Sequence, residues 1–258
     1  MPLTPILLCM HKAPLFPPLI LIVRPPRQAL ADVAVCEEAG WRAQIFSPMD
    51  IEADHEAVES LNERVRQADA VFWVSPSAVS VSARAVDFTN SSTRHIAVGE
   101  GTKKGLSVFC PYEVLCPSQG NDSEAVWELP VWKQLPLTAR ILIVRGYGGR
   151  NWLIEKLTAK GFTVDVAEVY FRRERQLDWV WFQQQQPQAA FVASAECVRL
   201  LFGQVPPSLA QLLKTLLYLT HHVRIAEALK AAGAEHIRVI PKLDAHALNH
   251  ALYGEKNE

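Results

Sequence analysis

The sequence lacks an excess of charge of either sign. Its 258 residues contain 26 Lys and Arg against 27 Asp and Glu, a net charge of −1, and 49% of them are hydrophobic. This balance excludes an intrinsically disordered chain, which combines low hydrophobicity with high net charge. It also argues against a protein that binds nucleic acid without regard to sequence, because phosphate contacts require a basic face.

A cysteine framework and long hydrophobic runs are also missing. The five cysteines are Cys9, Cys36, Cys110, Cys116 and Cys197. Their odd number and wide scatter fit neither a disulfide framework nor a metal site, which favours a reducing cytoplasm. The longest apolar stretch, residues 15–23, contains two prolines and is too short to span a bilayer, and no basic start precedes the apolar N-terminus. We therefore expect no membrane or export segment, and an irregular tail over residues 1–16.

An internal repeat is the most informative feature that is present. Ile20-Leu-Ile-Val-Arg24 recurs identically as Ile141-Leu-Ile-Val-Arg145. A continuous apolar run of this kind is typical of a strand buried on both faces of a parallel sheet. A helical pattern follows each copy and ends at a glycine, Gly40 or Gly161, at the same distance from the arginine. Glycine permits the left-handed conformation that terminates a helix, so sequence, spacing and cap together indicate a duplication.

Further segments match more weakly along the chain. Residues 70–75 and 189–194 each read as a strand that ends in a serine. Residues 95–102 and 215–222 each read as a strand, a polar loop and the start of a helix. Alternating strands and helices of this length predict an α/β protein with two similar domains, each a parallel β-sheet flanked by helices.

The carboxyl ends of the predicted strands carry the candidate site, because loops converge there in such sheets. The residues at these ends are hydroxyls, glycines, arginines and a histidine pair, which together suit an anion. They are Arg24, Ser75, Gly99 to Thr102, Arg145 to Arg150, Ser194, and Thr220 to His222. No Asp/Glu pair, Ser-His-Asp order or cysteine–histidine set stands out among them.

At this point the sequence resembles the uroporphyrinogen-III synthase family, over about residues 19–253. The matching motifs, in order, are Val23-Arg-Pro25, Val74-Ser-Pro-Ser-Ala-Val79, Gly99-Glu-Gly-Thr102, Pro117-x-x-Gly120-x-x-Ser123-Glu124, Arg145-Gly-Tyr-Gly-Gly-Arg150 and Val169-Tyr-Phe-Arg172. The resemblance rests on the ordered set of motifs at the spacing of the family. The departures lie in the second half, where Ala193-Ser194 replaces a common Thr-Ser pair.

The resemblance implies a definite reaction. The family converts hydroxymethylbilane, a linear tetrapyrrole polycarboxylate of haem biosynthesis, into uroporphyrinogen III, inverting ring D and losing water. The route passes through an azafulvene cation and a spirocyclic pyrrolenine, and it needs no metal or organic cofactor. The enzyme would be a cyclising hydro-lyase, cytoplasmic and monomeric, with no nucleic acid or membrane partner and at most a transient contact with the deaminase that precedes it in the pathway.

The resemblance also implies interleaved domains with the substrate in the cleft between them. One domain would comprise residues 1–47 and 173–258, and the other residues 52–168. Segments 48–51 and 169–172 would be the interdomain linkers.

Tyr170 matches the functional tyrosine of the family and is the predicted catalytic residue; the alternative is packing at a domain junction. The predicted substrate-binding residues are Arg24, Ser75, Thr102, Arg145, Gly148, Arg150, Ser194, Thr220 and His222. Each arginine holds either a substrate carboxylate or a nearby Asp or Glu. Each of Ser75, Thr102 and Ser194 is either a donor to the substrate or the N-cap of the next helix.

Two other functions compete with this hypothesis. One is a non-catalytic two-domain module that binds a carboxylated or phosphorylated small molecule. The other is an enzyme that binds a phosphorylated or nucleotide ligand at Gly146 to Arg150, although the dinucleotide spacing G-x-G-x-x-G is absent. His246 and His250 lie one helical turn apart, but no third ligand is near in sequence, so a solvated helix face is favoured over a metal site.

Overall fold

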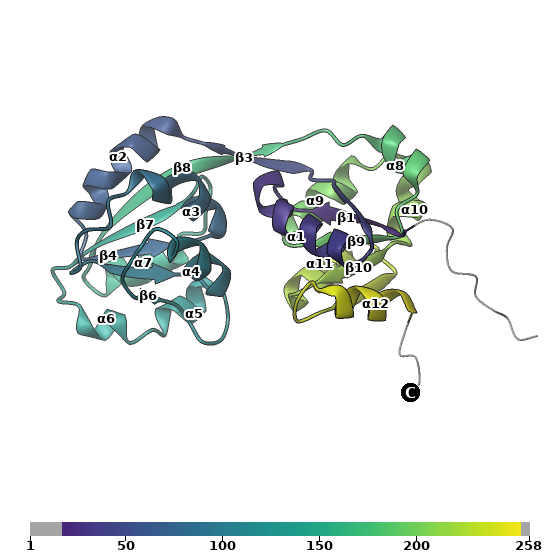
Figure 1. Cartoon of the computed structure of the whole chain (residues 1–258). Helices are drawn as coiled ribbons and strands as arrows, with labels where there is room; N and C mark the ends of the chain where they lie inside the picture. Colours follow the sequence, from purple (N-terminus) through teal and green to yellow (C-terminus); the bar gives the residue numbers. More distant parts are fainter. Residues whose placement is uncertain (1–16, 254–258) are drawn as a thin grey trace, which may run out of the picture. The chain divides into compact units, whose positions relative to one another are not determined.

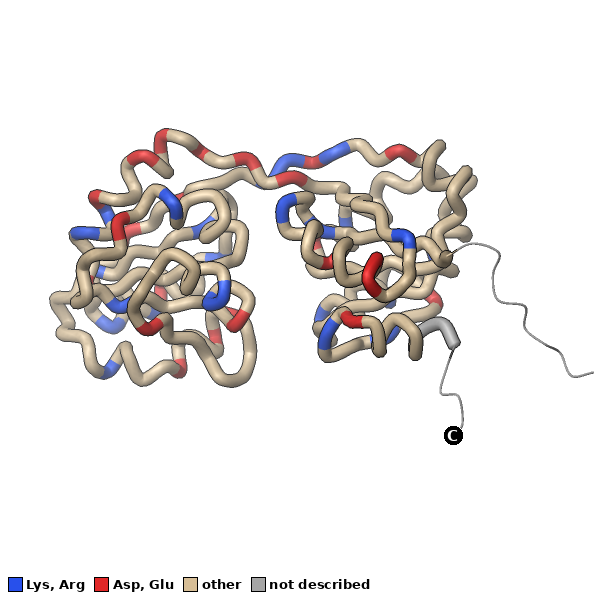
Figure 2. The backbone as a smooth tube through the Cα atoms, in the orientation of Figure 1, with Lys and Arg blue, Asp and Glu red and all other residues tan. Residues whose placement is uncertain are grey.

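The structure, a computed structural model, describes residues 17–253, with side chains described for residues 17–250. The predicted tail, residues 1–16, and Cys9 lie outside the described part. Among the described residues, no helix is long and apolar enough to cross a membrane. Basic and acidic residues are interspersed along both halves of the chain, in keeping with the balanced net charge (Figure 2).

The chain forms two compact units. Unit 1 comprises residues 1–50 and 174–258, and unit 2 comprises residues 51–173 (Figure 1). Two strands carry the chain across the boundaries, β3 (Met49–Ala53) and β8 (Thr163–Glu174). They run antiparallel, because the Asp54 N–H donates to Val169 O at 2.9 Å and the Arg175 N–H donates to Pro48 O at 2.9 Å. The expected linkers, 48–51 and 169–172, fall on this strand pair, and their role as linkers stays a prediction.

Unit 1 is built on a five-stranded sheet with the order β11-β10-β9-β1-β2, whose recorded strand pairs are all parallel. Its strands are β1 (Leu19–Val23), β2 (Arg42–Ile45), β9 (Ala189–Val192), β10 (Leu217–Thr220) and β11 (His236–Val239). Its helices are α1 (Pro26–Glu38), α8 (Trp179–Gln185), α9 (Ala195–Gln204), α10 (Ala210–Lys214), α11 (Val223–Ala231) and α12 (Ala245–Tyr253).

The alternation of side chains along β1 explains why helices cover both faces of this sheet. Leu21 and Val23 pack with residues of α8, α9, α10 and α11 on one face. Ile20 and Ile22 pack with α1 and α12 on the other face. A strand with apolar residues on both faces is stable only between two such layers.

Unit 2 has the sheet order β3-β8-β7-β4-β5-β6. Its other strands are β4 (Ala70–Trp73), β5 (Arg94–Ala97), β6 (Val114–Leu115) and β7 (Arg140–Gly146). Its helices are α2 (His55–Arg66), α3 (Pro76–Ser82), α4 (Glu100–Leu106), α5 (Ser123–Trp127), α6 (Val131–Gln134) and α7 (Trp152–Ala159). Leu142 and Val144 face α2, α3 and α4, whereas Ile141 and Ile143 face α5, α6 and α7.

The predicted duplication is confirmed in three dimensions. β2-β1-β9-β10-β11 of unit 1 corresponds strand by strand to β8-β7-β4-β5-β6 of unit 2. The two copies of the repeat have the same register, Ile22 beside Ile45 and Ile143 beside Val166. Gly40 and Gly161 have φ values of +82° and +105°, the left-handed conformation expected after each helix. Along the chain, unit 1 begins with β1, whereas the strand of unit 2 that corresponds to β1 is β7, which comes after β4, β5 and β6. The units are therefore circular permutations of each other.

One expected correspondence is wrong by three residues. Strand register places Tyr218 at the position of His95 and therefore His222 at the position of Gly99. Counting onward, Ile225 rather than Thr220 or His222 corresponds to Thr102. The reason is local: Thr215 caps the end of α10 instead of starting the strand.

Candidate functional site

The shared strand order creates one topological switch point in each unit. In unit 1 the chain continues from β1 to β2 on one side of the sheet and from β9 to β10 on the other, so the switch point lies between β1 and β9. In unit 2 it lies between β7 and β4 for the same reason. Ligands of open α/β sheets bind at the carboxyl ends of such strand pairs. Arg24 and Ser194 follow β1 and β9, while Arg145 and Ser75 lie at the matching ends in unit 2. The structure thus places these four residues at the strand ends where the sequence predicted them, and their role in binding stays a prediction.

Tyr170, on β8, lies beside the switch point of unit 2. Its side chain is only 2% exposed. Its hydroxyl oxygen lies 3.1 Å from Ser75 Oγ, and Arg172 Nη2 donates to it at 3.1 Å. The Arg172 guanidinium also lies 5.2 Å from the centre of the Tyr170 ring, and its Nη1 donates to the Tyr147 carbonyl at 3.1 Å. Tyr170 is thus held between a hydroxyl and a cation.

Gly146 makes room for the Tyr170 ring. A Cβ atom at this position would lie 2.5 Å from Tyr170 Cε2 and 2.9 Å from its hydroxyl oxygen, closer than non-bonded atoms approach. The register between β7 and β8 shifts at this glycine, and the Tyr147 N–H donates to Tyr170 O at 3.0 Å. Sequence reasoning treated Gly146 only as part of a glycine-rich loop, because the ring that covers it comes from another strand.

The serines at the two switch points are both N-caps. Ser75 Oγ accepts from the Ala78 N–H at 3.1 Å, and Ser194 Oγ accepts from the Cys197 N–H at 3.1 Å. Thr102 differs, because Gly99 is the N-cap of α4 and Thr102 lies inside the helix, 1% exposed. The N-cap alternative is therefore confirmed for the two serines and wrong for the threonine.

Arg145 forms most of its hydrogen bonds with its own loop. Nη1 donates to the carbonyls of Gly149 and Arg150 at 3.1 Å each and to Asn151 Oδ1 at 3.0 Å. Nη2 forms a 3.1 Å ion pair with Glu168, and the side chain is 11% exposed. Arg145 therefore shapes the glycine-rich loop, where Gly148 adopts a φ of +72°.

The same loop is tied to the rest of unit 2 at two further points. Arg150 Nη2 forms an exposed 2.7 Å ion pair with Glu124, a hydrogen bond that raises the pKa of Arg150. The Tyr147 hydroxyl donates to Asp54 at 2.7 Å and its ring stacks on Phe171 at 4.1 Å. The bond to Asp54 raises the pKa of Tyr147, so the phenol stays protonated.

At the switch point of unit 1, Arg24 has a partner of its own. Nη1 forms a 2.6 Å ion pair with Asp32, and Nη2 lies 3.5 Å from Gln28 Oε1. Within the described residues, the buried Nε atoms of Arg24 and Arg145 both lack a hydrogen-bond partner. The two arginines thus occupy equivalent positions with different partners.

Thr220 and His222 also lie at the carboxyl edge of the unit 1 sheet. His222 caps α11, its Nδ1 accepting from the Arg224 N–H at 3.1 Å. Thr220 is fully buried, and in the described part of the chain its Oγ1 has no partner.

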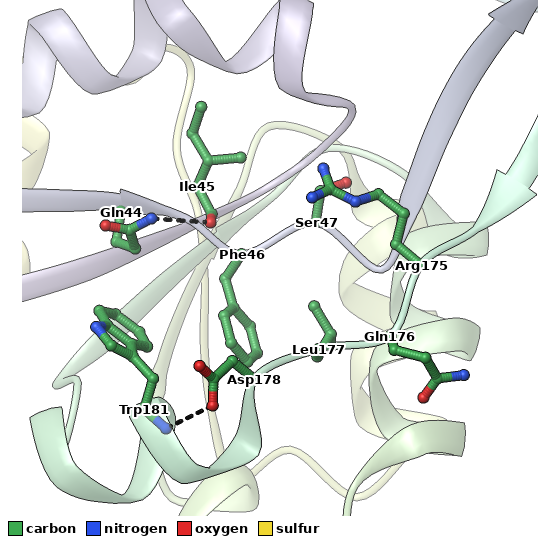
Figure 3. Close-up of a pocket in the computed structure, with 9 residues that line it drawn as sticks. All are labelled: Gln44, Ile45, Phe46, Ser47, Arg175, Gln176, Leu177, Asp178 and Trp181. Carbon is green, nitrogen blue, oxygen red and sulfur yellow. Dashed lines mark hydrogen bonds between the residues drawn. The ribbon is translucent and has the colours of Figure 1, made fainter.

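A cavity of about 260 Å³ opens at the end of β2 in unit 1 (Figure 3). It is lined by Gln44, Ile45, Phe46, Ser47, Arg175, Gln176, Leu177, Asp178 and Trp181. Its polar groups are partly engaged, since Asp178 accepts from the Trp181 N–H at 2.8 Å and Ser47 donates to Met49 O at 2.6 Å. None of the predicted site residues lines it, and no motif joins its two segments in sequence.

The His, Cys, Asp and Glu side chains of the described residues do not gather into a metal site. No three of these described side chains lie close enough together to hold a metal ion. His246 and His250 stack at 6.2 Å on an exposed helix face, where Arg238 donates to the His250 carbonyl. Burial raises the pKa of Cys36 to about 12, so its thiol stays protonated.

Comparison with known proteins identifies relatives along nearly the whole chain. The family model of uroporphyrinogen-III synthase HemD matches residues 31–249. A uroporphyrinogen-III synthase of Salmonella typhimurium is 28% identical over 246 residues, covering 90% of this chain and 99% of the relative.

Solved structures agree on the fold. A mutant uroporphyrinogen III synthase from Thermus thermophilus matches with a TM-score of 0.58 at 17% identity, covering 92% of this chain and 99% of that one. A uroporphyrinogen-III synthetase from Helicobacter pylori matches with a TM-score of 0.56 at 15% identity, covering 90% of this chain and 97% of that one. With a family model that spans most of its length, the chain belongs to the uroporphyrinogen-III synthase family of enzymes.

Proposed function

We propose that this chain cyclises hydroxymethylbilane to uroporphyrinogen III, inverting ring D and releasing water, as a cofactor-independent lyase of haem biosynthesis. The observation that carries the proposal is the family match together with the Tyr170–Ser75 hydroxyl pair at the switch point of unit 2. We place the activity in the cytoplasm, with a monomer as the working form and at most a transient contact with the preceding deaminase.

The chemistry needs one bond to break before the ring can close. The hydroxyl of the substrate leaves with the electron pair of its C–O bond, and the azafulvene cation remains. An O–H donor near that hydroxyl assists its departure as a general acid, and the Tyr170–Ser75 pair supplies such a donor. The cation then closes through the spirocyclic pyrrolenine, so the main contribution of the protein is to hold the linear chain in the pose that leads to inversion.

The carboxylates of the substrate require donors around this hydroxyl pair. Among the three proposed arginines, Arg150 is the most accessible, because its side chain is 59% exposed, against 21% for Arg24 and 11% for Arg145. An exposed ion pair contributes only about 0–1 kcal/mol and exchanges readily for a substrate carboxylate. We keep Arg24, Thr102, Arg145, Gly148, Ser194, Thr220 and His222 as further proposed contacts.

Buried members of this set act more indirectly than exposed ones. Thr102 and Thr220 are 1% and 0% exposed, so their side chains reach a ligand only after neighbouring groups move. Arg145 fixes the loop in which Gly148 is exposed and left-handed.

A coupled assay tests the proposal. Freshly generated hydroxymethylbilane is supplied to the full chain, and the product isomers are separated chromatographically. We expect uroporphyrinogen III as the dominant product. If the I isomer accumulates at the proportion of the enzyme-free reaction, the proposed function is wrong. Purified chain treated with a chelator is the matched control, and its unchanged turnover is the expected result for cofactor-independent cyclisation.

A further inference from the structure

The contacts of Tyr170 and Ser75 fix how many hydroxyl hydrogens are left over. A hydroxyl has one hydrogen to donate and two lone pairs to accept, whereas a guanidinium only donates. Tyr170 accepts from Arg172, and Ser75 accepts from the Ala78 N–H. The 3.1 Å contact between the two hydroxyls uses one of their two hydrogens. One O–H hydrogen therefore remains for a ligand, on Tyr170 or on Ser75.

Burial decides which residue carries the spare hydrogen. Tyr170 is 2% exposed, while Ser75 is half-buried. If Ser75 donated to Tyr170, the spare hydrogen would lie on the buried phenol. If Tyr170 donates to Ser75, the spare hydrogen lies on the more accessible serine. The second arrangement places the donor where a ligand can reach it.

We propose that Ser75 is the group that donates to the leaving hydroxyl of the substrate, and that Tyr170 and Arg172 are positioning residues behind it. The inference rests on the proposed function and assigns the parts within its site. As the C–O bond breaks, the Ser75 hydrogen moves to the leaving oxygen, which departs as water with the electron pair. Ser75 takes the Tyr170 hydrogen, and Tyr170 regains the proton that ring closure releases.

Arg172 gives this relay its direction. Its donation to the phenolic oxygen keeps that oxygen an acceptor on one side, which turns the phenolic hydrogen toward Ser75. The same cation stabilises the negative charge that the phenolic oxygen acquires while its proton is displaced. Arg172 also spans two acceptors, the Tyr170 hydroxyl and the Tyr147 carbonyl, which holds the guanidinium in one orientation.

A double-mutant cycle with Ser75→Ala and Tyr170→Phe tests the relay in the isomer assay. We expect each single variant to lower kcat about tenfold with KM within about threefold, the size of losing one charge-assisted hydrogen bond. Because Tyr170 acts on the substrate only through Ser75, the double variant is expected to lie within about threefold of the slower single variant. Ser75→Thr keeps the hydroxyl and the cap and should restore kcat to within about threefold.

Arg172→Met extends the cycle. It should lower kcat about tenfold in the otherwise unchanged chain and less than about twofold when Tyr170→Phe is already present.

Arg173→Met is the matched control, since it removes the same charge from the next residue of β8, where Arg173 pairs with Glu52 at 2.6 Å. Asp178→Ala controls for the loss of a helix cap, because Asp178 caps α8 as Ser75 caps α3. Both controls should keep kcat.

The outcomes separate the inference from the function on which it rests. An unchanged chain that leaves the I isomer at its enzyme-free proportion overturns both. If the unchanged chain makes uroporphyrinogen III but Ser75→Ala keeps full turnover while Tyr170→Phe loses it, the phenol acts directly and the relay is wrong. If the two losses multiply in the double variant, the residues act separately and the relay is equally wrong.

Discussion

The two units share one strand order, yet their switch points are equipped differently. Ser194 and Ser75 occupy equivalent positions and both cap a helix, but only Ser75 also contacts a phenol. Counted from Gly40 and Gly161, Met49 stands in unit 1 where Tyr170 stands in unit 2, and Pro25 stands where Gly146 does. Duplication therefore preserved the scaffold and the caps, while the hydroxyl pair and the glycine beneath it belong to unit 2 alone.

The largest expected effect comes from the glycine that distinguishes unit 2. Gly146→Ala should displace the Tyr170 ring, lower kcat about a hundredfold and cost about 1–3 kcal/mol of stability through overpacking. Turnover and the urea unfolding midpoint measure the two effects. Gly203→Ala in α9 of unit 1 is the control, because no atom lies within 4 Å of the added Cβ and a small gain in stability follows. Full activity of Gly146→Ala would show that the ring position is irrelevant.

Acid tests the buried histidine of unit 2 next. His95 is 2% exposed, and burial lowers its pKa to about 4. The unfolded chain takes up a proton near the ordinary pKa of about 6.5, whereas the folded chain stays neutral there. The contribution of neutral His95 to the free energy of unfolding is therefore fully present above pH 6.5. It is lost as the pH drops toward 4, by about 3 kcal/mol at most.

Tyr218, at the equivalent position of unit 1, does not titrate in acid, and its hydroxyl donates to Leu213 O at 2.8 Å. Urea unfolding at about pH 7 and pH 4.5 measures the slope. His95→Phe should flatten it, while Tyr218→Phe should cost about 1 kcal/mol at both pH values. A slope that survives His95→Phe would assign the acid sensitivity to other groups.

Tyr170→Phe and Met49→Leu compare equivalent positions directly. The first should lower kcat about tenfold and, like Tyr218→Phe, cost about 1 kcal/mol of stability. The second alters only a buried apolar side chain, 5% exposed, and should cost less than about 1.5 kcal/mol with turnover unchanged. Circular dichroism melts and the isomer assay provide the two readouts. Equal turnover in the two variants would remove the functional difference between the units.

The smallest effect concerns the caps that the units share. Ser75→Ala and Ser194→Ala should each cost about 1 kcal/mol of stability, since each removes one side-chain acceptor from the start of a helix. Turnover should fall further for Ser75→Ala, because only this serine also contacts Tyr170. Equal losses of turnover in the two variants would contradict this prediction, because they would show that Ser75 and Ser194 contribute equally to activity.

The sequence predicted the elements that depend on local patterns. Buried strands such as Ile141 to Val144 and the glycine caps follow from spacing and residue type, and the N-cap was one of two roles open for each serine. The partners of Arg24 and Arg145 could not be predicted, because they depend on which of several nearby acceptors a long side chain reaches. The contact of Gly146 with Tyr170 joins two strands through a register shift, for which the sequence carries no signal.

The circular permutation has a consequence for synthesis on the ribosome. Unit 2 is a continuous segment, whereas β1 of unit 1 must await β9, as the hydrogen bond from the Leu19 N–H to Gln188 across 169 positions illustrates. Contacts between distant segments form late because closing the intervening loop is entropically costly. Unit 2 is therefore expected to fold while the nascent chain still exposes the apolar strand β1, which pairs with β9 only after most of the chain has been made.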